Sequence, residues 1–164
     1  MPILRVGVSH RRASLDLLER LAFADGDLPK AYRRLADDPD VREAVLLSTC
    51  NRVEVYANVA SYHPGSLALR RFLSAASEVS PGELAGALSI DYEEQAVEHL
   101  FLVAAGMDSM VLGEPQILGQ VREAHRRAEE EGASGPVVAA VFRAAVRAGR
   151  RVRAEAGLGA PPAA

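Results

Sequence analysis

The order of strand and helix patterns predicts an α+β fold, namely a ferredoxin-like βαββαβ sandwich with additional C-terminal helices. Over the first 90 residues the patterns follow the order strand, helix, strand, strand, helix, strand, which is the split βαβ arrangement. The two middle strands lie so close in the sequence that they must form a hairpin. After residue 90 the apolar residues recur at helical spacing almost to the end of the chain.

Composition indicates a single globular domain. The chain has 164 residues, of which 49% are apolar and 25% charged, enough to bury a sizeable core. It contains no run of about 18 apolar residues and no charged-then-apolar leader, so we expect no membrane association and a cytoplasmic location. The net charge of −3 argues against a protein whose whole surface is built for nucleic acid.

Runs of apolar and β-branched residues predict the four strands. They lie at 3–9, 41–48, 53–59 and, more weakly, 87–90. The short interval between the second and third runs places residues 48–52 at the tip of a hairpin or in an abrupt bend.

Capping signals predict three helices between these strands. Ser14 can cap a helix that buries the leucines following it, and Asp27 can cap a second helix with Pro29 in its first turn. A third helix is predicted from about residue 66 to residue 77, where leucine and phenylalanine mark the inner face.

Three further helices follow the last strand. Asp91 and Glu94 form a capping-box pattern before the first of them, and Gly106 can end it in the left-handed conformation. Pro115 suits the first turn of the second helix, which runs to an acidic stop. The last helix is predicted at about 136–155.

The composition changes after the last helix. Residues 1–156 form one predicted domain, whereas residues 157–164 are glycine, leucine, alanine and proline, a mixture typical of linkers. We therefore expect the chain to be the first domain of a longer protein, followed by the start of a linker.

Cys50, the only cysteine, lies in the predicted turn between the two middle strands. A lone cysteine can form no internal disulfide and no CxxC pair, so it serves either packing or nucleophilic chemistry. Its neighbours supply hydroxyls, an amide, a cation and a carboxylate, more polarity than a buried cysteine usually tolerates. They are Ser48, Thr49, Asn51, Arg52 and Glu54. A buried structural cysteine remains the alternative.

Arginines gather in the last predicted helix. Five occur between Val141 and Arg153 without an acidic residue among them, at positions 143, 147, 150, 151 and 153. At helical spacing 143, 147 and 151 share one face, which could meet a phosphate backbone. The alternative interpretation is an ordinary solvated helix face.

Three segments, at 6–13, 47–56 and 99–121, together resemble the N-terminal catalytic domain of glutamyl-tRNA reductase. The resemblance covers residues 3 to about 157. Its most specific parts are the stretches Ser48-Thr49-Cys50-Asn51-Arg52 and Gly113-Glu114-Pro115-Gln116-Ile117-Leu118-Gly119-Gln120.

This resemblance implies the reduction of Glu-tRNA to glutamate-1-semialdehyde in tetrapyrrole biosynthesis. It implies NADPH as the cofactor, bound by a following domain, because the chain has no glycine-rich dinucleotide loop after a strand. The implied partners are Glu-tRNA, a second copy in a homodimer and glutamate-1-semialdehyde aminotransferase downstream. The four histidines and the cysteine show no metal-ligand spacing, so we expect a metal-free site.

The resemblance also implies roles for single residues. Cys50 attacks the aminoacyl ester and forms a thioester, and Arg52 is placed to pair with the side-chain carboxylate of the substrate. Glu54 and Glu114 suit either the α-ammonium group or the orientation of Arg52. The remaining substrate-binding positions are Thr49, Asn51, Ser109, Pro115, Gln116 and Gln120.

His99 matches a family histidine needed for full activity. It could orient the substrate or move a proton to the departing ribose oxygen. Its apolar neighbours leave a core histidine as the alternative.

Two other functions fit parts of the sequence. Ferredoxin-like sheets serve in RNA recognition, but only Tyr56 among the aromatic residues lies on a predicted strand, too few for a stacking surface. A thiol esterase would pair Cys50 with His99 and would need no tRNA.

Overall fold

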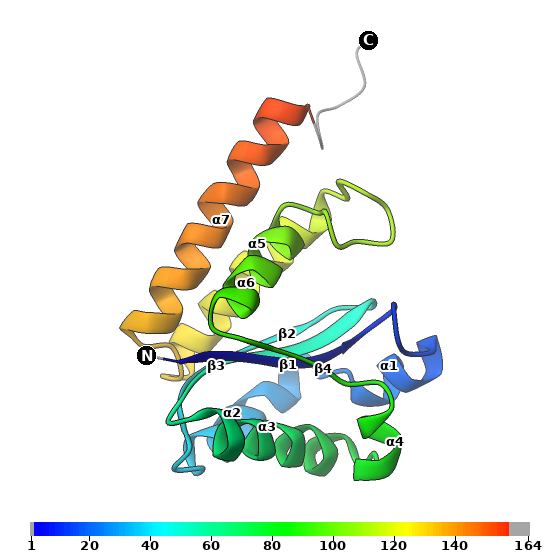
Figure 1. Ribbon diagram of the computed structural model, residues 1–164, viewed down its shortest axis with the longest axis vertical. Coiled ribbons are helices and arrows are strands. Elements are labelled where there is room, and N and C mark those ends of the chain that lie inside the picture. The colour runs from blue at the N-terminus through cyan, green and yellow to red at the C-terminus, as the bar shows by residue number, and fades with distance from the viewer. Residues whose placement is uncertain (1, 158–164) are drawn as a thin grey trace.

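The computed structural model describes residues 2–157 as a four-stranded sheet with helices on both faces (Figure 1). The sheet order is β2-β3-β1-β4, and every neighbouring pair is antiparallel. The mixed helix-and-sheet class predicted from the sequence is therefore confirmed. The strands are β1 (Ile3–Ser9), β2 (Val41–Ser48), β3 (Arg52–Val59) and β4 (Ser89–Tyr92).

The two middle strands form the expected hairpin. Ser48 is opposite Val53 and Val45 is opposite Tyr56, which leaves a three-residue turn at 49–51. The weakly predicted last strand begins two residues later than expected. The amides of Ala87 and Leu88 both donate to the carbonyl of Leu84, so these residues close a helical turn before the strand begins.

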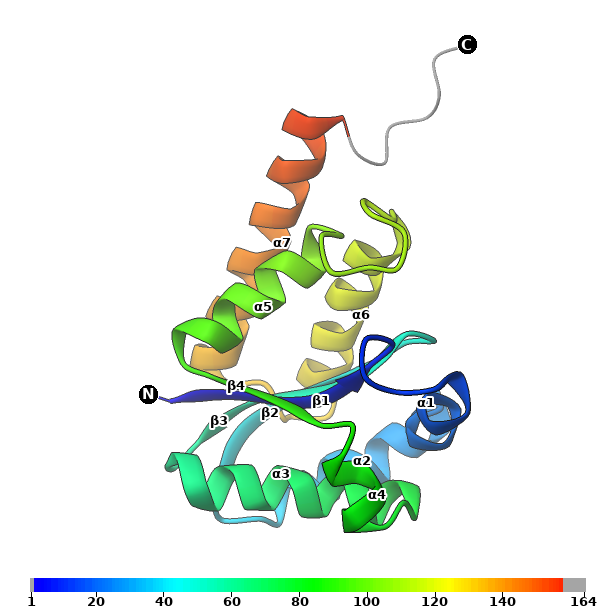
Figure 2. The same cartoon turned by 45° about the vertical axis from the view of Figure 1, so that its right-hand side comes forward.

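One face of the sheet is covered by the helices that precede β4 (Figure 2). They are α1 (Leu15–Leu21), a 3₁₀ turn at Asp25–Asp27, α2 (Leu28–Ala36), α3 (Tyr62–Ser77) and α4 (Pro81–Ala85). Ser14 caps α1 as predicted, since its side chain accepts a hydrogen bond from Leu17 N. The short α4 was not predicted from the sequence, although Ser80 caps it through Glu83 N and Pro81 begins it.

The opposite face is covered by the C-terminal helices, as Figures 1 and 2 show. They are α5 (Glu94–Ala104), α6 (Gln116–Glu130) and α7 (Pro136–Ala156). Gly106 has a φ of 78° just beyond α5, so its predicted left-handed conformation is confirmed. None of the helices described between residues 2 and 157 is long and apolar enough to cross a bilayer.

The predicted capping box before α5 is wrong. Asp91 lies within β4, where its carboxylate accepts a hydrogen bond from Arg5 Nε at 3.0 Å, and is therefore engaged away from the helix. The N-cap position belongs instead to Glu93, which has a φ of 53° and makes no side-chain cap bond.

Close contact between α5 and α7 depends on Gly149. A Cβ atom at this position would lie 2.8 Å from the carbonyl oxygen of Ala104, closer than real Cβ atoms approach an oxygen. Gly119 in α6 is different, because a Cβ there would meet nothing within 4 Å. Gly149 is therefore required for packing, whereas Gly119 only carries the ordinary cost of glycine in a helix.

We expect Gly149→Ala to lower the free energy of unfolding by about 1–3 kcal/mol, because the added methyl group forces the two helices apart. Gly119→Ala should instead raise it by roughly 0.5–1 kcal/mol, the usual gain of alanine over glycine inside a helix. Urea unfolding of both variants and the wild type measures these changes. A stabilising Gly149→Ala would contradict the close helix crossing.

Candidate active site

Cys50 lies in the turn between β2 and β3, and its side chain is exposed. The turn is held by backbone bonds from Thr49 N to Arg52 O at 2.9 Å and from His10 N to Asn51 O at 2.9 Å. Asn51 N also donates to Thr49 Oγ1 at 3.2 Å. The thiol is therefore presented to solvent from a fixed turn, which excludes a cysteine buried only for packing.

A cavity of about 150 Å³ adjoins the thiol. Its walls come from the 49–51 turn, from the loop between α5 and α6, and from the first turns of α6. Eight predicted site residues line it, namely Thr49, Cys50, Asn51, Arg52, Ser109, Glu114, Gln116 and Gln120. Its apolar wall was not predicted from the sequence, and it is formed by Met110, Val111 and Ile117. Pro115, Glu54 and His99 are not among the lining residues.

Two glycines and one arginine hold the ends of the loop at 106–114. Gly106 and Gly113 both have positive φ, 78° and 76°, and Gly113 N donates to Gly106 O at 3.0 Å. From α7, Arg153 donates to the carbonyls of Gly113 at 3.1 Å and Glu114 at 2.7 Å. Arg153, one of the five arginines of the last helix, is thus a buried anchor for the loop.

Arg52 is buried at the back of the cavity, with 1% of its side chain exposed. Its Nη1 lies 3.0 Å from Asp108 Oδ2 and 3.4 Å from Glu54 Oε1, and its Nη2 donates to Asp108 O at 2.7 Å. Burial alone would lower the pKa of Arg52, but Glu54 and Asp108 outweigh that effect and raise the pKa. The guanidinium is therefore a permanent cation beside the thiol-bearing turn.

Glu54 lies behind Arg52, fully buried on β3. Its carboxylate accepts hydrogen bonds from Arg5 Nη1 at 3.2 Å and Tyr56 OH at 3.0 Å, and His99 Nε2 lies 2.7 Å from it. Burial alone would raise the pKa of Glu54. The hydrogen bond from His99 and the charges of His99, Arg52 and Arg5 outweigh burial and lower the pKa to about 2.

His99 projects from α5 toward this buried carboxylate and not into the cavity. Its Nδ1 lies 3.9 Å from Asp91 Oδ2, and its side chain is 18% exposed. Within residues 2–157 no described hydrogen bond joins His99 to Cys50, so the structure does not show a cysteine–histidine pair.

Four exposed arginines line a separate groove of about 300 Å³ between α6 and α7. They are Arg122, Arg143, Arg147 and Arg150. None of the ion pairs described between residues 2 and 157 involves these four, whereas Arg151 on the same helix is paired with Glu155 at 2.9 Å. The groove therefore concentrates uncompensated positive charge on a protein whose net charge is −3.

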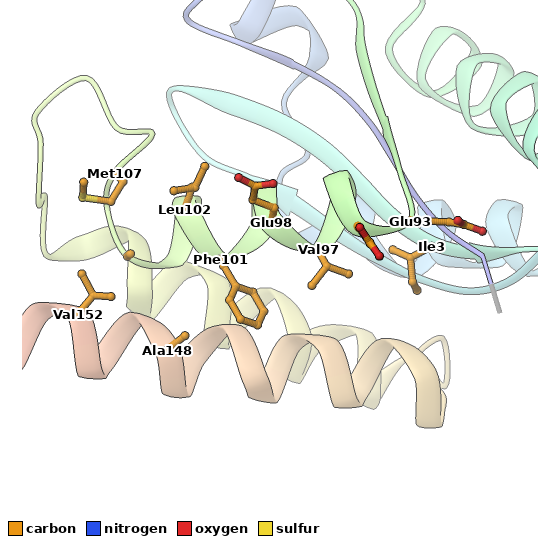
Figure 3. A pocket seen from close by; sticks show the side chains of 11 residues that line it. Ile3, Glu93, Val97, Glu98, Phe101, Leu102, Met107, Ala148 and Val152 are labelled. Carbon is orange, nitrogen blue, oxygen red and sulfur yellow. The ribbon is translucent and has the colours of Figure 1, made fainter.

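A larger cavity, of about 800 Å³, lies elsewhere, between α5 and α7 (Figure 3). Its lining is largely apolar and includes Val97, Phe101, Leu102, Met107 and Val152, together with Glu93 and Glu98. It contains no nucleophile and no fixed cation, so the smaller cavity beside Cys50 is the better candidate for chemistry despite its size. In the part of the chain that the structure describes, no group of three or more histidine, cysteine, aspartate or glutamate residues could hold a metal ion.

Comparisons with known proteins point to one family. A family model described as glutamyl-tRNAGlu reductase, N-terminal domain, matches residues 6–156. The chain is 47% identical to the glutamyl-tRNA reductase of Acidothermus cellulolyticus over 155 residues, covering 94% of this chain and 33% of that protein. For the enzyme of Rubrobacter xylanophilus the identity is 47% over 159 residues, covering 97% and 37%.

A solved structure shows the same similarity. Glutamyl-tRNA reductase from Methanopyrus kandleri superimposes with a TM-score of 0.74 at 33% identity, covering 93% of this chain and 34% of that one. The chain thus spans about a third of the length of the curated relatives it matches.

We expect Glu54→Gln to lower the free energy of unfolding at neutral pH by about 3–5 kcal/mol, because Arg5 and Arg52 lose their shared buried anion. The folded-state pKa of Glu54, about 2, lies below its ordinary value of 4.5. The wild type therefore has the carboxylate's full contribution above pH 4.5 and loses it as the pH falls toward 2. The difference between variant and wild type should shrink over that interval.

Urea unfolding at several pH values checks this expectation. Glu83→Gln is the control, because Glu83 pairs with Arg20 at the surface and both side chains are more than 40% exposed. A difference between Glu54→Gln and the wild type that stays constant down to the lowest pH would contradict the lowered pKa.

Proposed function

This chain belongs to the glutamyl-tRNA reductase family, and on that premise we propose that residues 1–156 are its catalytic domain, which binds Glu-tRNA and forms a thioester at Cys50. The observation that carries the proposal is the cavity in which an exposed thiol, a permanent cation and several amide and hydroxyl groups meet. Residues 157–164 are proposed as the start of a linker, and 158–164 lie outside the described residues.

The proposed reaction begins with the Cys50 thiolate. Its sulfur attacks the carbonyl carbon of the aminoacyl ester, a C–S bond forms and the C–O bond to the tRNA ribose breaks, while the departing oxygen takes up a proton. A thioester carbonyl is more electrophilic than an oxygen ester, so dividing the reaction in two lowers each barrier. Exposure of the thiol on a turn supports access by a substrate as large as tRNA.

Binding of the glutamyl group is proposed to use Arg52 for its side-chain carboxylate. Thr49, Asn51, Ser109, Gln116 and Gln120 supply neutral polar groups around the same cavity. Pro115 is exposed and directly precedes α6. We propose that it sets the direction in which α6 begins and so helps to place the substrate-binding side chains of that helix.

The two glutamates are proposed to have different roles. Glu114 lines the cavity and suits the α-ammonium group of the substrate. Glu54 is buried behind Arg52, and its carboxylate accepts a hydrogen bond from that arginine, so we propose that Glu54 orients Arg52. His99 also contacts Glu54, which supports a positioning role for this histidine through the buried carboxylate rather than proton transfer at the cavity.

NADPH is proposed as the cofactor of the whole protein. Dinucleotides bind where a glycine-rich turn follows a strand of a parallel sheet. The sheet described between residues 2 and 157 is antiparallel throughout, so it does not fit this cofactor. We assign NADPH binding to another domain of the whole protein. The whole protein would reduce the thioester to glutamate-1-semialdehyde.

Several properties of the whole protein are proposed with this activity. They are a homodimer, glutamate-1-semialdehyde aminotransferase as the downstream partner, and a cytoplasmic location. For the domain itself we propose a ferredoxin-like sandwich, which the strand order β2-β3-β1-β4 and the antiparallel pairing support.

RNA binding by the sheet itself is not favoured, because helices cover both faces and Tyr56 is only 1% exposed. We propose instead that the arginine groove between α6 and α7 contacts the phosphate backbone of tRNA. Its four arginines make no described ion pair, so their charge is available to phosphates.

We expect wild-type protein mixed with Glu-tRNA and quenched in acid to gain the mass of one glutamyl group. Cys50→Ser should show no adduct that hydroxylamine releases, because a serine ester resists hydroxylamine more than a thioester does. Intact-protein mass spectrometry measures both. An equal adduct in Cys50→Ser, or equal rates of Glu-tRNA deacylation in the two proteins, would remove Cys50 from the mechanism.

We expect the double variant Arg143→Ala with Arg147→Ala to weaken tRNA binding and to make it less dependent on salt. The slope of log affinity against log salt should fall by roughly one for each phosphate that the variant no longer neutralises. The control is Arg33→Ala with Arg34→Ala, which removes the same charge from α2 on the opposite face of the sheet. Equal slopes in the two double variants would exclude the groove.

A further inference from the structure

Asp108 is held between two arginines at the edge of the Cys50 cavity. Its Oδ2 lies 3.0 Å from Arg52 Nη1, and its Oδ1 lies 2.9 Å from Arg11 Nε. Its backbone oxygen also accepts the 2.7 Å hydrogen bond from Arg52 Nη2. Both terminal nitrogens of Arg52 are therefore occupied by one residue of the 106–114 loop.

Arg52 is paired with the carboxylate of Asp108. The glutamyl side chain that Arg52 is proposed to bind also ends in a carboxylate on an alkyl chain. Arg52 reaches the cavity wall, yet only 1% of its side chain is exposed. An incoming carboxylate that pairs with both terminal nitrogens of this guanidinium would take the place that Asp108 now holds. The Asp108 side chain is more accessible, at 17% exposure.

The loop is built so that Asp108 can leave. Its ends are fixed by Arg153 and by the left-handed Gly106 and Gly113. Of the hydrogen bonds described for residues 108–112, only those of Asp108 reach outside the loop. Met110, Val111 and Leu112 are each more than 60% exposed. Asp108 is consequently the main attachment of the loop tip to the rest of the domain.

We propose that Asp108 is a specificity-determining residue, whose carboxylate holds Arg52 in the free protein and yields it to the side-chain carboxylate of the substrate. Arg11 is 57% exposed and keeps Asp108 paired after the exchange. When a carboxylate ligand binds, the pair of Arg52 with Asp108 is replaced by a pair of Arg52 with the ligand. A ligand with a neutral amide offers Arg52 no such replacement, because displacing Asp108 would leave the buried cation with Glu54 alone, which Arg5 already shares.

This inference rests on the proposed function for the identity of the substrate, but the exchange itself is tested without tRNA. Cys50 is the only thiol in the chain, so its alkylation reports directly on the cavity. Iodoacetate and iodoacetamide react with the same atom, and they differ in carrying a carboxylate or an amide. The ratio of their rate constants measures how available Arg52 is to a small carboxylate.

We expect Asp108→Asn to raise the ratio of iodoacetate to iodoacetamide rate constants by about tenfold, the effect of one modest charge-assisted pair. The control is Glu114→Gln, which removes one negative charge from the same cavity without releasing Arg52. This control should raise the ratio much less. Circular dichroism and thermal unfolding establish that both variants are folded.

A second probe is glutarate, a small dicarboxylate. It should protect Cys50 from iodoacetamide at lower concentrations in Asp108→Asn than in the wild type, and its diamide should protect neither protein. An Asp108→Asn ratio no larger than that of Glu114→Gln would overturn the proposal, as would equal protection by glutarate in wild type and Asp108→Asn. Failure of the glutamyl adduct alone would instead contradict the proposed function and leave these ratios unaffected.

Discussion

The buried carboxylate of Glu54 is the interaction on which the rest of the site depends. Arg5 from β1, Arg52 and Tyr56 from β3, and His99 from α5 all converge on it. Each arginine would be costly to bury alone, and their shared anion makes the burial tolerable. The same carboxylate therefore joins the sheet to the helical layer above it and fixes the guanidinium that faces the cavity.

The cavity itself combines segments that are far apart in the sequence. The turn at 49–51 is set by the hairpin, the polar side chains of α6 enter from the other layer, and the 106–114 loop closes between them. Arg153 connects this loop to α7 by donating to carbonyls at its end. The hairpin thus places the thiol and the cation, whereas α6 and the loop supply the other walls of the cavity.

Arg52 contacts the carboxylates of Glu54 and Asp108, which differ in how deeply they are buried. Glu54 is fully enclosed and has further partners in Arg5, Tyr56 and His99, so it remains ionised and in place. Asp108 is partly exposed, is attached to a loop and has a second cation in the exposed Arg11. Glu54 thus orients Arg52 permanently. Asp108 pairs with Arg52 until, in our proposal, a carboxylate ligand replaces it.

By itself, the sequence determined the elements whose signals are local: three of the strands, the hairpin turn that carries Cys50, the cap at Ser14 and the left-handed Gly106. Only the tertiary structure decided the partners of charged residues. Asp91 follows a capping-box pattern but pairs with Arg5, and Arg153 is one of five arginines in the last helix but is buried as the anchor of the loop. The reason is physical. A capping signal or a helical period acts over a few neighbouring residues, whereas an ion pair such as that of Arg5 and Asp91, 86 positions apart, exists only after the layers have packed.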